Sequence, residues 1–361
     1  MTYCYCFESI WHYSIMKLTI FVAITASLAS EAFVPLPSSH RTISHSTPLY
    51  AIGALAKKAK QATLKEYAKK GVPEDVMAVY KEIKANMSAE ASDKPGPLQR
   101  TLTKRQGTIT IIAEYKRKSS FSKDRIHEIF EPELLSPVFR EYGCLGIAVM
   151  ADPNMGGCTY DDIASFVEEQ RKAKNEVPGP VAVINSDLVV DELQVAMTKA
   201  YGCAACVLNL NIVGADEISH LLSTCRVVDL EAIVEVSSAE EAQQAVDLGA
   251  RIVSVVHVEN VDQMADIVVN LPDDVCTIAN LLLTHDDKDV KEVEQAWAIR
   301  DKGFNCVWVG EPLYKAGADA VETPGNIIKS MRSKSSLRFA SARIASGKGE
   351  GAREYLGDIL M

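Results

Sequence analysis

The first candidates for chemistry are two charged residues, two positions apart, that follow an apolar segment. Glu114 and Lys116 lie in the run Ala113-Glu114-Tyr115-Lys116-Arg117-Lys118-Ser119. Residues two apart on a β-strand share one face. A carboxylate and an ammonium on an inward face are costly to bury unless they are paired or used. The pattern therefore indicates either a structural ion pair or a site that uses both charges.

A second candidate is the carboxylate of Glu235, which interrupts the apolar run Ile233-Val234-Glu235-Val236. Its apolar neighbours argue against a surface position, which leaves either a functional role or a purely structural one. Isolated polar residues, such as His257 and Asn280, follow other apolar runs. The simpler interpretation of these is hydrogen-bonded residues at the rim of the fold rather than catalytic residues. Cys203 and Cys206 have redox spacing, but a redox pair begins a helix that follows a strand. Here the pair follows a predicted helix, which favours small core residues.

Eight short apolar runs must position these residues, and amphipathic segments such as Tyr160–Ala173 and Asp289–Lys302 separate them. Strands that alternate with helices predict a parallel sheet covered on both faces. Eight units within 106–333 predict an α/β fold, a (β/α)8 TIM barrel, with its site at the carboxyl ends of the strands. The alternative, a doubly wound open sheet, usually carries a glycine fingerprint after its first strand, and none is found here. The predicted strands are Ile109–Ala113, Leu145–Met150, Val181–Ile184, Cys206–Leu210, Ala232–Val236, Ile252–Val256, Val275–Ala279 and Cys306–Val309.

The composition is that of an ordinary globular protein. Of 361 residues, 47% are hydrophobic and 24% are charged, which excludes a mainly disordered, collagenous or multi-spanning membrane protein. The net charge of −10 argues against a nucleic-acid partner, which would call for a strongly basic surface. The nine cysteines have no regular spacing and predict buried thiols in a reducing compartment rather than a disulfide scaffold.

Residues 1–50 have the composition of a targeting presequence. The apolar run Leu18–Ala29 follows a single lysine and is too short to cross a bilayer comfortably, which favours a signal peptide over a membrane anchor. We expect a start at Met16, cleavage after Ala32 and no membrane segment in the mature form. A Ser/Thr-rich stretch without acidic residues follows Ala32-Phe33-Val34-Pro35, and this order resembles the bipartite plastid presequence of diatoms and related algae. The resemblance implies delivery to the plastid stroma (chloroplast).

Residues 51–105 form a basic region in which helical spacing predominates. The region holds 12 Lys and Arg against 6 Asp and Glu, and Gly71-Val72-Pro73 separates predicted helices at Ile52–Lys70 and Glu74–Met87. We interpret it as a solvated helical N-terminal extension; the alternative is a docking arm for an acidic partner. Ser92–Pro97 is predicted to be a linker, and 334–361 to be a basic C-terminal tail.

The segment Ile111-Ile112-Ala113-Glu114-Tyr115-Lys116-Arg117-Lys118-Ser119 closely resembles the first-strand motif of the indole-3-glycerol-phosphate synthase family. The resemblance covers about residues 100–333. Further matches follow in the family's order, at Gly156-Gly157, at Asp187 through Gln194, at Ile233-Val234-Glu235-Val236 and at Val309-Gly310-Glu311-Pro312-Leu313.

The resemblance implies a lyase of tryptophan biosynthesis that needs no metal or organic cofactor. The family closes 1-(2-carboxyphenylamino)-1-deoxyribulose 5-phosphate into indole-3-glycerol phosphate with loss of CO2 and water. By the resemblance, Lys116 would hold the substrate carboxylate and Glu114 would orient Lys116. Glu235 would transfer protons during the dehydration.

The resemblance also implies a site for the phosphate of this small-molecule substrate. Ser119, Gly310 and the backbone N–H of Glu311 would bind it, because hydroxyl groups and backbone amides suit phosphate oxygens.

Several positions depart from the family motif. Ser186 stands where the family has a second catalytic lysine, immediately before the Asp of the third strand. His257 and Glu259 replace an Asn and an Arg, and Asn280-Leu281-Leu282 replaces Glu-Ser-Gly. Two alternatives therefore stay open. The chain would be a catalytically impaired barrel that retains a phosphate-ligand site and acts as a binding or assembly subunit, or a relative with another substrate that uses His257, His285 or Asp187 as its acid.

Overall fold

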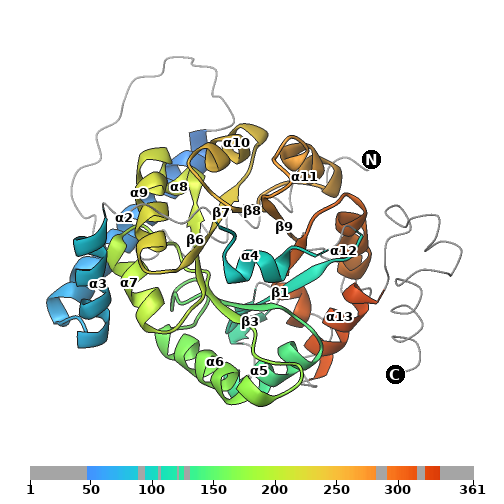
Figure 1. The fold of residues 1–361 in the computed structure, drawn as a ribbon, viewed down its shortest axis with the longest axis horizontal. Helices are drawn as coiled ribbons and strands as arrows, with labels where there is room; N and C mark the ends of the chain where they lie inside the picture. Colours follow the sequence, from blue (N-terminus) through green and yellow to red (C-terminus); the bar gives the residue numbers. More distant parts are fainter. Residues whose placement is uncertain are drawn as a thin grey trace, which may run out of the picture. The chain divides into compact units, whose positions relative to one another are not determined.

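A computed structural model describes residues 47–87, 94–104, 107–119, 122–125, 131–281, 291–314 and 322–333 (Figure 1). Their contacts divide the chain into two units, Met1–Lys58 and Ala59–Met361, and helix α2 (Thr47–Lys70) crosses the boundary. All features discussed below belong to the second unit. Residues 1–46 of the predicted presequence and all of the predicted C-terminal tail lie outside the described residues, and the proposed domain boundaries stay predictions.

Eight parallel strands close into a barrel, which confirms the predicted (β/α)8 TIM barrel. Each strand begins and ends within two residues of its predicted position. The order around the barrel is β1-β10-β9-β8-β7-β6-β5-β4, so each strand pairs with its neighbours along the chain and the last pairs with the first. The strands are β1 (Thr110–Tyr115), β4 (Gly146–Val149), β5 (Ala182–Asn185), β6 (Ala205–Asn209), β7 (Glu231–Val236), β8 (Ile252–Val255), β9 (Cys276–Asn280) and β10 (Cys306–Val309).

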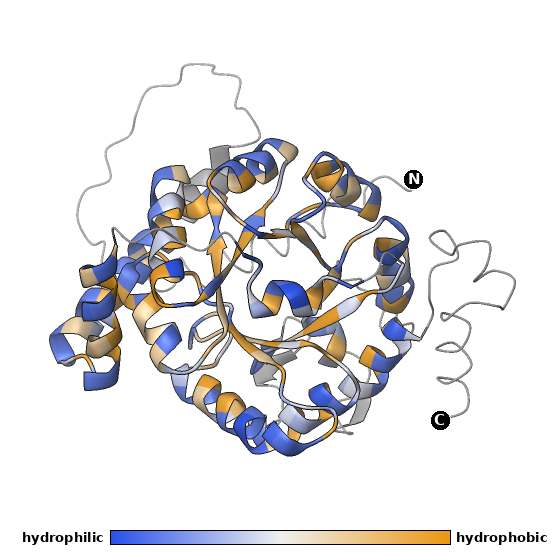
Figure 2. Cartoon of the chain, in the orientation of Figure 1, coloured by the Kyte–Doolittle hydropathy of each residue, from blue (hydrophilic) through white to orange (hydrophobic). Residues whose placement is uncertain are grey.

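Helices surround the barrel, and their apolar sides face the strands (Figures 1 and 2). Local signals set their ends: Thr159 and Asp162 form a capping box at the start of α6, and Gly202, with φ +85°, follows α7. The helices and 3-10 turns that follow β-strands are α5 (Pro132–Glu141), α6 (Tyr160–Lys172), η2 (Ala173–Asn175), α7 (Glu192–Ala200), α8 (Leu210–Val213), α9 (Ala215–Val227), α10 (Ala239–Asp247), α11 (Val261–Val268), α12 (Lys291–Asp301), η3 (Glu311–Tyr314) and α13 (Glu322–Arg332).

The interior of the barrel is a packed apolar cluster, separate from the larger core between strands and helices. A short helix, α4 (Pro97–Leu102), adds Leu98 and Leu102 to this cluster. It lies at the amino ends of the strands, because Glu231 at the start of β7 accepts hydrogen bonds from the backbone N–H of Leu98 (2.6 Å) and Gln99 (2.9 Å). The helix therefore closes that end of the barrel. The linker prediction for Ser92–Pro97 is wrong at its last residue, because Pro97 is the first residue of α4, a position that suits its fixed φ.

The N-terminal helices are packed against the barrel rather than solvated on all sides. Helix α3 (Glu74–Asn86) buries Val76 and Ile83 completely and packs on α7. Leu64 and Tyr67 of α2 also pack against the main core. The apolar contacts fix the second half of α2 against the barrel.

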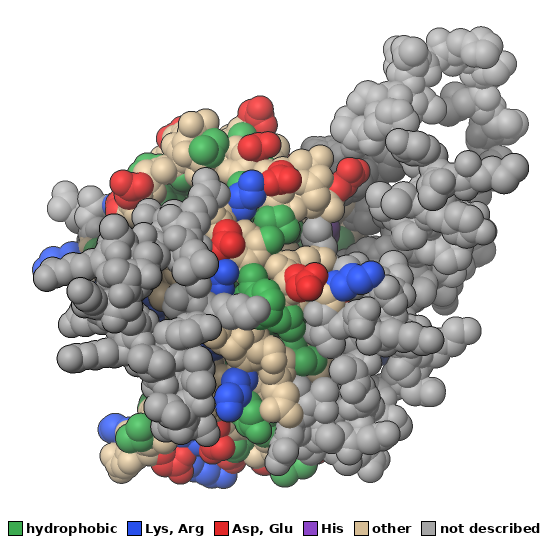
Figure 3. Space-filling view, turned by 90° about the vertical axis from the view of Figure 1, so that its right-hand side faces the viewer, with side chains coloured by type: hydrophobic (Ala, Val, Ile, Leu, Met, Phe, Trp, Pro, Cys, Tyr) green, Lys and Arg blue, Asp and Glu red, His purple; other side chains and the backbone are tan. Residues whose placement is uncertain are grey.

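One face of the described surface is mixed in charge. On the face shown in Figure 3, acidic, basic and apolar side chains are interspersed. Beyond β1, the short strands β2 (Lys118–Ser119) and β3 (Ser122–Arg125) pair antiparallel.

None of the helices described above combines the length and the apolar character that a bilayer crossing requires. All seven cysteines that the structure describes are buried and free, including Cys203 and Cys206, as expected for core residues.

We expect Leu102→Ala to lower the free energy of unfolding by about 2–5 kcal/mol, because it opens a cavity under the barrel interior. Urea unfolding of the full chain measures the change. Leu134→Ala on α5 is the matched control, since Leu134 is 49% exposed, and should change stability by less than about 0.5 kcal/mol. Equal effects of the two variants would show that α4 does not stabilise the barrel.

Candidate active site

The candidate site is a layer of polar residues that lies directly above the apolar interior. Side chains alternate along a strand, so a residue two positions beyond an interior residue also points inward. Ile112, Ile184, Ile233 and Trp308 belong to the interior cluster. On seven of the eight strands, the residue two positions beyond the interior residue is polar or glycine. We call these seven residues the polar layer: Glu114, Ser186, Asn209, Glu235, Ser254, Asn280 and Gly310.

Hydrogen bonds within the polar layer confirm that its members face one another. The hydroxyl of Ser186 on the β5 side donates to Glu114 Oε1 at 3.4 Å. Asn209 Nδ2 donates to Glu235 Oε2 at 2.9 Å, and Asn280 Nδ2 donates to Ser254 Oγ at 2.8 Å. The carboxylates of Glu114 and Glu235 therefore belong to the same end of the barrel, as the sequence predicts.

Glu114 and Lys116 form an ion pair with 2.9 Å between Oε2 and Nζ. Both are largely removed from solvent, with side chains 9% and 17% exposed. The residue that follows them points the other way: Arg117 binds Glu131 and Asp162 on the helix side of the sheet. The ion pair thus places one ammonium beside one carboxylate at the mouth, where a substrate with groups of either charge could bind.

The predicted phosphate residues lie at the ends of β1 and β10. Gly310 directly follows β10, and Glu311 begins η3. A Cβ atom on Gly310 would lie 2.6 Å from Glu114 Oε2, so any other residue here would require the Glu114 carboxylate to shift. Ser119 belongs to β2, but its side chain lies outside the described residues. The phosphate-binding roles of these three residues stay predictions.

The sequence reasoning missed one functional candidate, Lys60 of α2. Its Nζ binds Asp187 Oδ1 at 2.6 Å and also binds Asp152 Oδ2. Asp152 follows β4 and Asp187 follows β5, so both carboxylates lie at the carboxyl ends of strands, next to the polar layer. The expectation that the basic extension is solvated holds for Lys65, Lys69 and Lys70, but it is wrong for Lys60, whose side chain is 13% exposed. Its place among the lysines of α2 carries no signal that would have singled it out.

The two carboxylates that bind Lys60 have pKa values shifted in opposite directions. Burial raises the pKa of Asp187 to about 6, although the Lys60 ammonium opposes the shift. Burial works the same way on Asp152, but Lys60 and the backbone N–H groups of Met155 and Asn154 outweigh it and hold the pKa below its usual value. Burial disfavours the Lys60 ammonium too, yet the two carboxylates together raise its pKa. The Lys60 ammonium therefore lies between one ionised carboxylate, Asp152, and one carboxyl group that is easily protonated, Asp187.

The family model described as "Indole-3-glycerol phosphate synthase" matches residues 62–323. The chain belongs to the indole-3-glycerol phosphate synthase family. Proteins of that name from Leptospira interrogans and Kineococcus radiotolerans are 28% and 29% identical to it. The first match covers 41% of this chain and about half (55%) of the relative; the second covers 68% and 88%. A solved structure, "Native KDPGal structure", shares 16% identity over 63% of this chain and 95% of its own, with a TM-score of 0.46.

Membership in the indole-3-glycerol phosphate synthase family confirms the resemblance and makes the chain a lyase-family barrel of tryptophan biosynthesis. The departures from the family motif are also visible in the structure. Ser186 occupies the polar layer where the motif has its second lysine, and its hydroxyl binds Glu114. His257, with φ +57°, and Glu259 are exposed beyond β8 rather than part of the layer. Within the described residues, no cluster of three or more His, Cys, Asp or Glu side chains could hold a metal ion.

We expect the Asp187 carboxyl group to titrate near pH 6. Because its pKa is higher in the folded than in the unfolded chain, its stabilising contribution is complete below about pH 4 and is lost as the pH rises through about 6. Carbon-13 NMR of the protein labelled at aspartate carboxyl carbons measures the midpoint, and Asp187→Asn assigns the signal. A midpoint for that signal near the ordinary value of about 4 would contradict the burial argument.

Proposed function

We propose that this protein is an indole-3-glycerol-phosphate synthase. It would close 1-(2-carboxyphenylamino)-1-deoxyribulose 5-phosphate into indole-3-glycerol phosphate, with loss of CO2 and water. The observation that carries the proposal is the shared location of Glu114, Lys116 and Glu235 around the mouth of one barrel. The reaction needs these group types, since it starts from an anionic carboxylate and ends with proton transfers.

Lys116 is the group that would hold the substrate carboxylate. Its ammonium is already desolvated and lies 2.9 Å from Glu114, so it is oriented before the substrate arrives. As the new carbon–carbon bond forms, the carboxylate leaves as CO2. Glu114 keeps Lys116 at the edge of the polar layer and accepts a hydrogen bond from Ser186.

Glu235 is the group that would move protons when the hydroxyl group leaves as water. Asn209 donates to one of its oxygens at 2.9 Å, which orients the carboxylate. The phosphate would bind at the ends of β1 and β10, with Ser119, Gly310 and the backbone N–H of Glu311 as its partners. Glycine at position 310 permits close approach of a ligand to the backbone there.

A second candidate function is a barrel that binds the ligand without turning it over. The observation in its favour is Ser186, which puts a hydroxyl group in the polar layer where the family motif has an ammonium. A hydroxyl group is a far weaker proton donor at neutral pH. The loss of one positioned acid lowers a rate by about 10² to 10⁴. Turnover of the full chain with the ring-closure substrate separates the two functions, since a binding subunit would bind indole-3-glycerol phosphate and form none.

Lys116→Ala and Glu235→Gln should each lower kcat/KM by about 10²-fold or more, because each removes a positioned charged group. Lys199→Ala on α7 and Glu240→Gln on α10 are matched controls on the outer helices and should change the rate less than about twofold. Steady-state kinetics on the full chain measures all four.

Ser186→Lys should raise turnover, because an ammonium beside Glu114 would supply a proton donor in the polar layer. If the wild-type chain is inactive and Ser186→Lys, His257→Asn and Leu281→Ser together restore nothing, the synthase proposal fails.

We further propose that the protein works in a plastid stroma without a nucleic-acid partner. The support is the Leu18–Ala29 apolar run, the Phe33-Val34-Pro35 segment and the net charge of −10. A fluorescent reporter fused to residues 16–60 should reach the stroma of a diatom plastid. Phe33→Ala is the matched control and should retain the reporter outside the stroma. Secretion of the unaltered fusion, or its retention in the endoplasmic reticulum membrane, would contradict this localisation.

A further inference from the structure

An ammonium from outside the barrel reaches the carboxyl ends of two barrel strands. Lys60 lies on α2, and it lies two positions before the first residue matched by the family model. It joins Asp152 after β4 to Asp187 after β5. The side chains of these three residues are 13%, 14% and 5% exposed, so the cluster is largely removed from water.

The helix also docks through apolar contacts. Leu64 and Tyr67, on the same helix, already pack against the main core, and α3 is anchored by Val76 and Ile83. Burying an ammonium and two carboxylates is less favourable than burying apolar groups of similar size. By contrast, Lys84 of α3 binds Glu192 with its side chain 51% exposed, as expected for an ordinary surface contact.

Each carboxylate that binds Lys60 also holds a loop at the mouth. Asp152 Oδ1 accepts hydrogen bonds from the backbone N–H groups of Asn154 (2.8 Å) and Met155 (3.0 Å). In the same loop, the carbonyl oxygen of Gly156 accepts hydrogen bonds from the backbone N–H groups of Arg117 and Lys118. The loop that Asp152 shapes is thus tied to the end of β1.

Asp187 holds the second loop in the same manner. Its Oδ1 accepts a hydrogen bond from the backbone N–H of Leu188 at 2.8 Å, and its Oδ2 accepts one from Gln194 at 3.3 Å. Its own N–H donates to Asn185 Oδ1 at 3.1 Å. Ser186 lies between these two fixed residues, and its hydroxyl reaches Glu114 in the polar layer. A line of contacts therefore runs from Lys60 through Asp187 and Ser186 to the Glu114–Lys116 ion pair.

From these contacts we infer that Lys60 is a positioning residue, supplied by the N-terminal helix, that holds the β4 and β5 loops and through them the polar layer. Without the Lys60 ammonium, the bridge between Asp152 and Asp187 is lost, burial favours the protonated form of Asp187, and the two loops lose the contact that joins them. Its effect on the reaction rests on the proposed function, whereas its effect on the loops does not.

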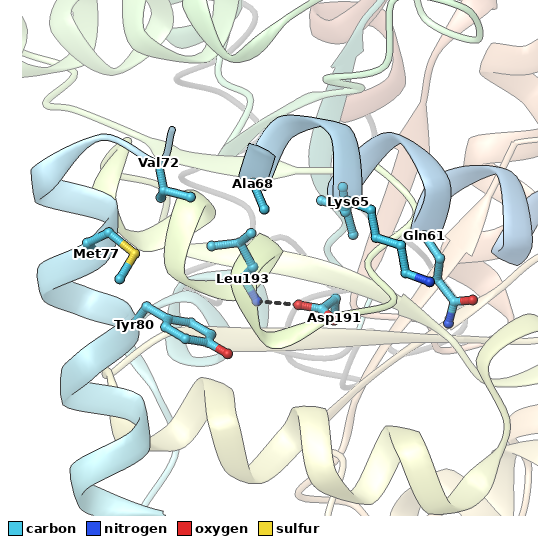
Figure 4. A pocket seen from close by; sticks show the side chains of 9 residues that line it. Gln61, Lys65, Ala68, Val72, Met77, Tyr80, Asp191 and Leu193 are labelled. Carbon is cyan, nitrogen blue, oxygen red and sulfur yellow. Dashed lines mark hydrogen bonds between the residues drawn. The ribbon is translucent and has the colours of Figure 1, made fainter. Parts of the chain in front are cut away.

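The first test measures the loops directly. In Lys60→Met, the backbone amides of Asn154, Met155 and Leu188 should exchange with deuterium about tenfold faster than in the wild type. Lys65→Met is the matched control, because Lys65 lies on the same helix but lines the groove between α2, α3 and the start of α7 (Figure 4), and it should leave these amides unchanged. Lys60→Arg keeps a charge that can bind both carboxylates and should restore most of the protection.

The second test measures the reaction on the full chain. Lys60→Met should lower kcat/KM by about 10- to 100-fold, the usual size for a residue that orients an active-site group, and Lys60→Arg should recover most of it. If the amides exchange at the wild-type rate in Lys60→Met, or if the arginine and methionine variants behave alike, the inference is overturned. If the wild type shows no turnover while the amides respond as expected, the proposed function fails and the positioning role stands.

Discussion

The alternation of side chains in a closed parallel barrel is the constraint on which the rest of the structure depends. Because the sheet has no edge, every second side chain of each strand must point into the same narrow interior. One level of that interior is filled by the buried apolar side chains of Ile112, Ile184, Ile233 and their neighbours. The next level faces the open end, where polar groups can be bound by solvent or by a ligand. The register of the strands thus decides which residues support the barrel and which meet a substrate.

Much of this arrangement could be predicted from the sequence. The β-branched apolar runs predict the eight strands, because residues buried on both faces of a sheet leave a nearly continuous apolar pattern. The spacing of Ile112 and Glu114, and of Ile233 and Glu235, then places both carboxylates on the inward face without further information. Helix α4 was missed because its six residues are too few to show a helical period and because Pro97 is typical of a linker.

Lys60 could not be predicted, and the reason is physical. Several lysines lie along α2, and helical spacing alone cannot tell which of them turns toward a carboxylate, since that depends on how the whole helix docks. The docking depends in turn on Leu64 and Tyr67, whose partners are far away in the sequence. Asp152 and Asp187 are separate rim residues in the sequence and become one cluster only when β4 and β5 lie side by side. Contacts between distant elements thus decide the electrostatics of the mouth.

Helix α4 gives the barrel a closed floor and therefore a single doorway. Leu98 and Leu102 seal the end opposite the polar layer, and Glu231 fastens the helix there. Any molecule that binds above the apolar interior has to enter from the mouth and return the same way. In the proposed reaction, CO2 and water would therefore leave through the same opening as indole-3-glycerol phosphate. Release of the products through the mouth, and not only bond formation, would then limit the turnover rate.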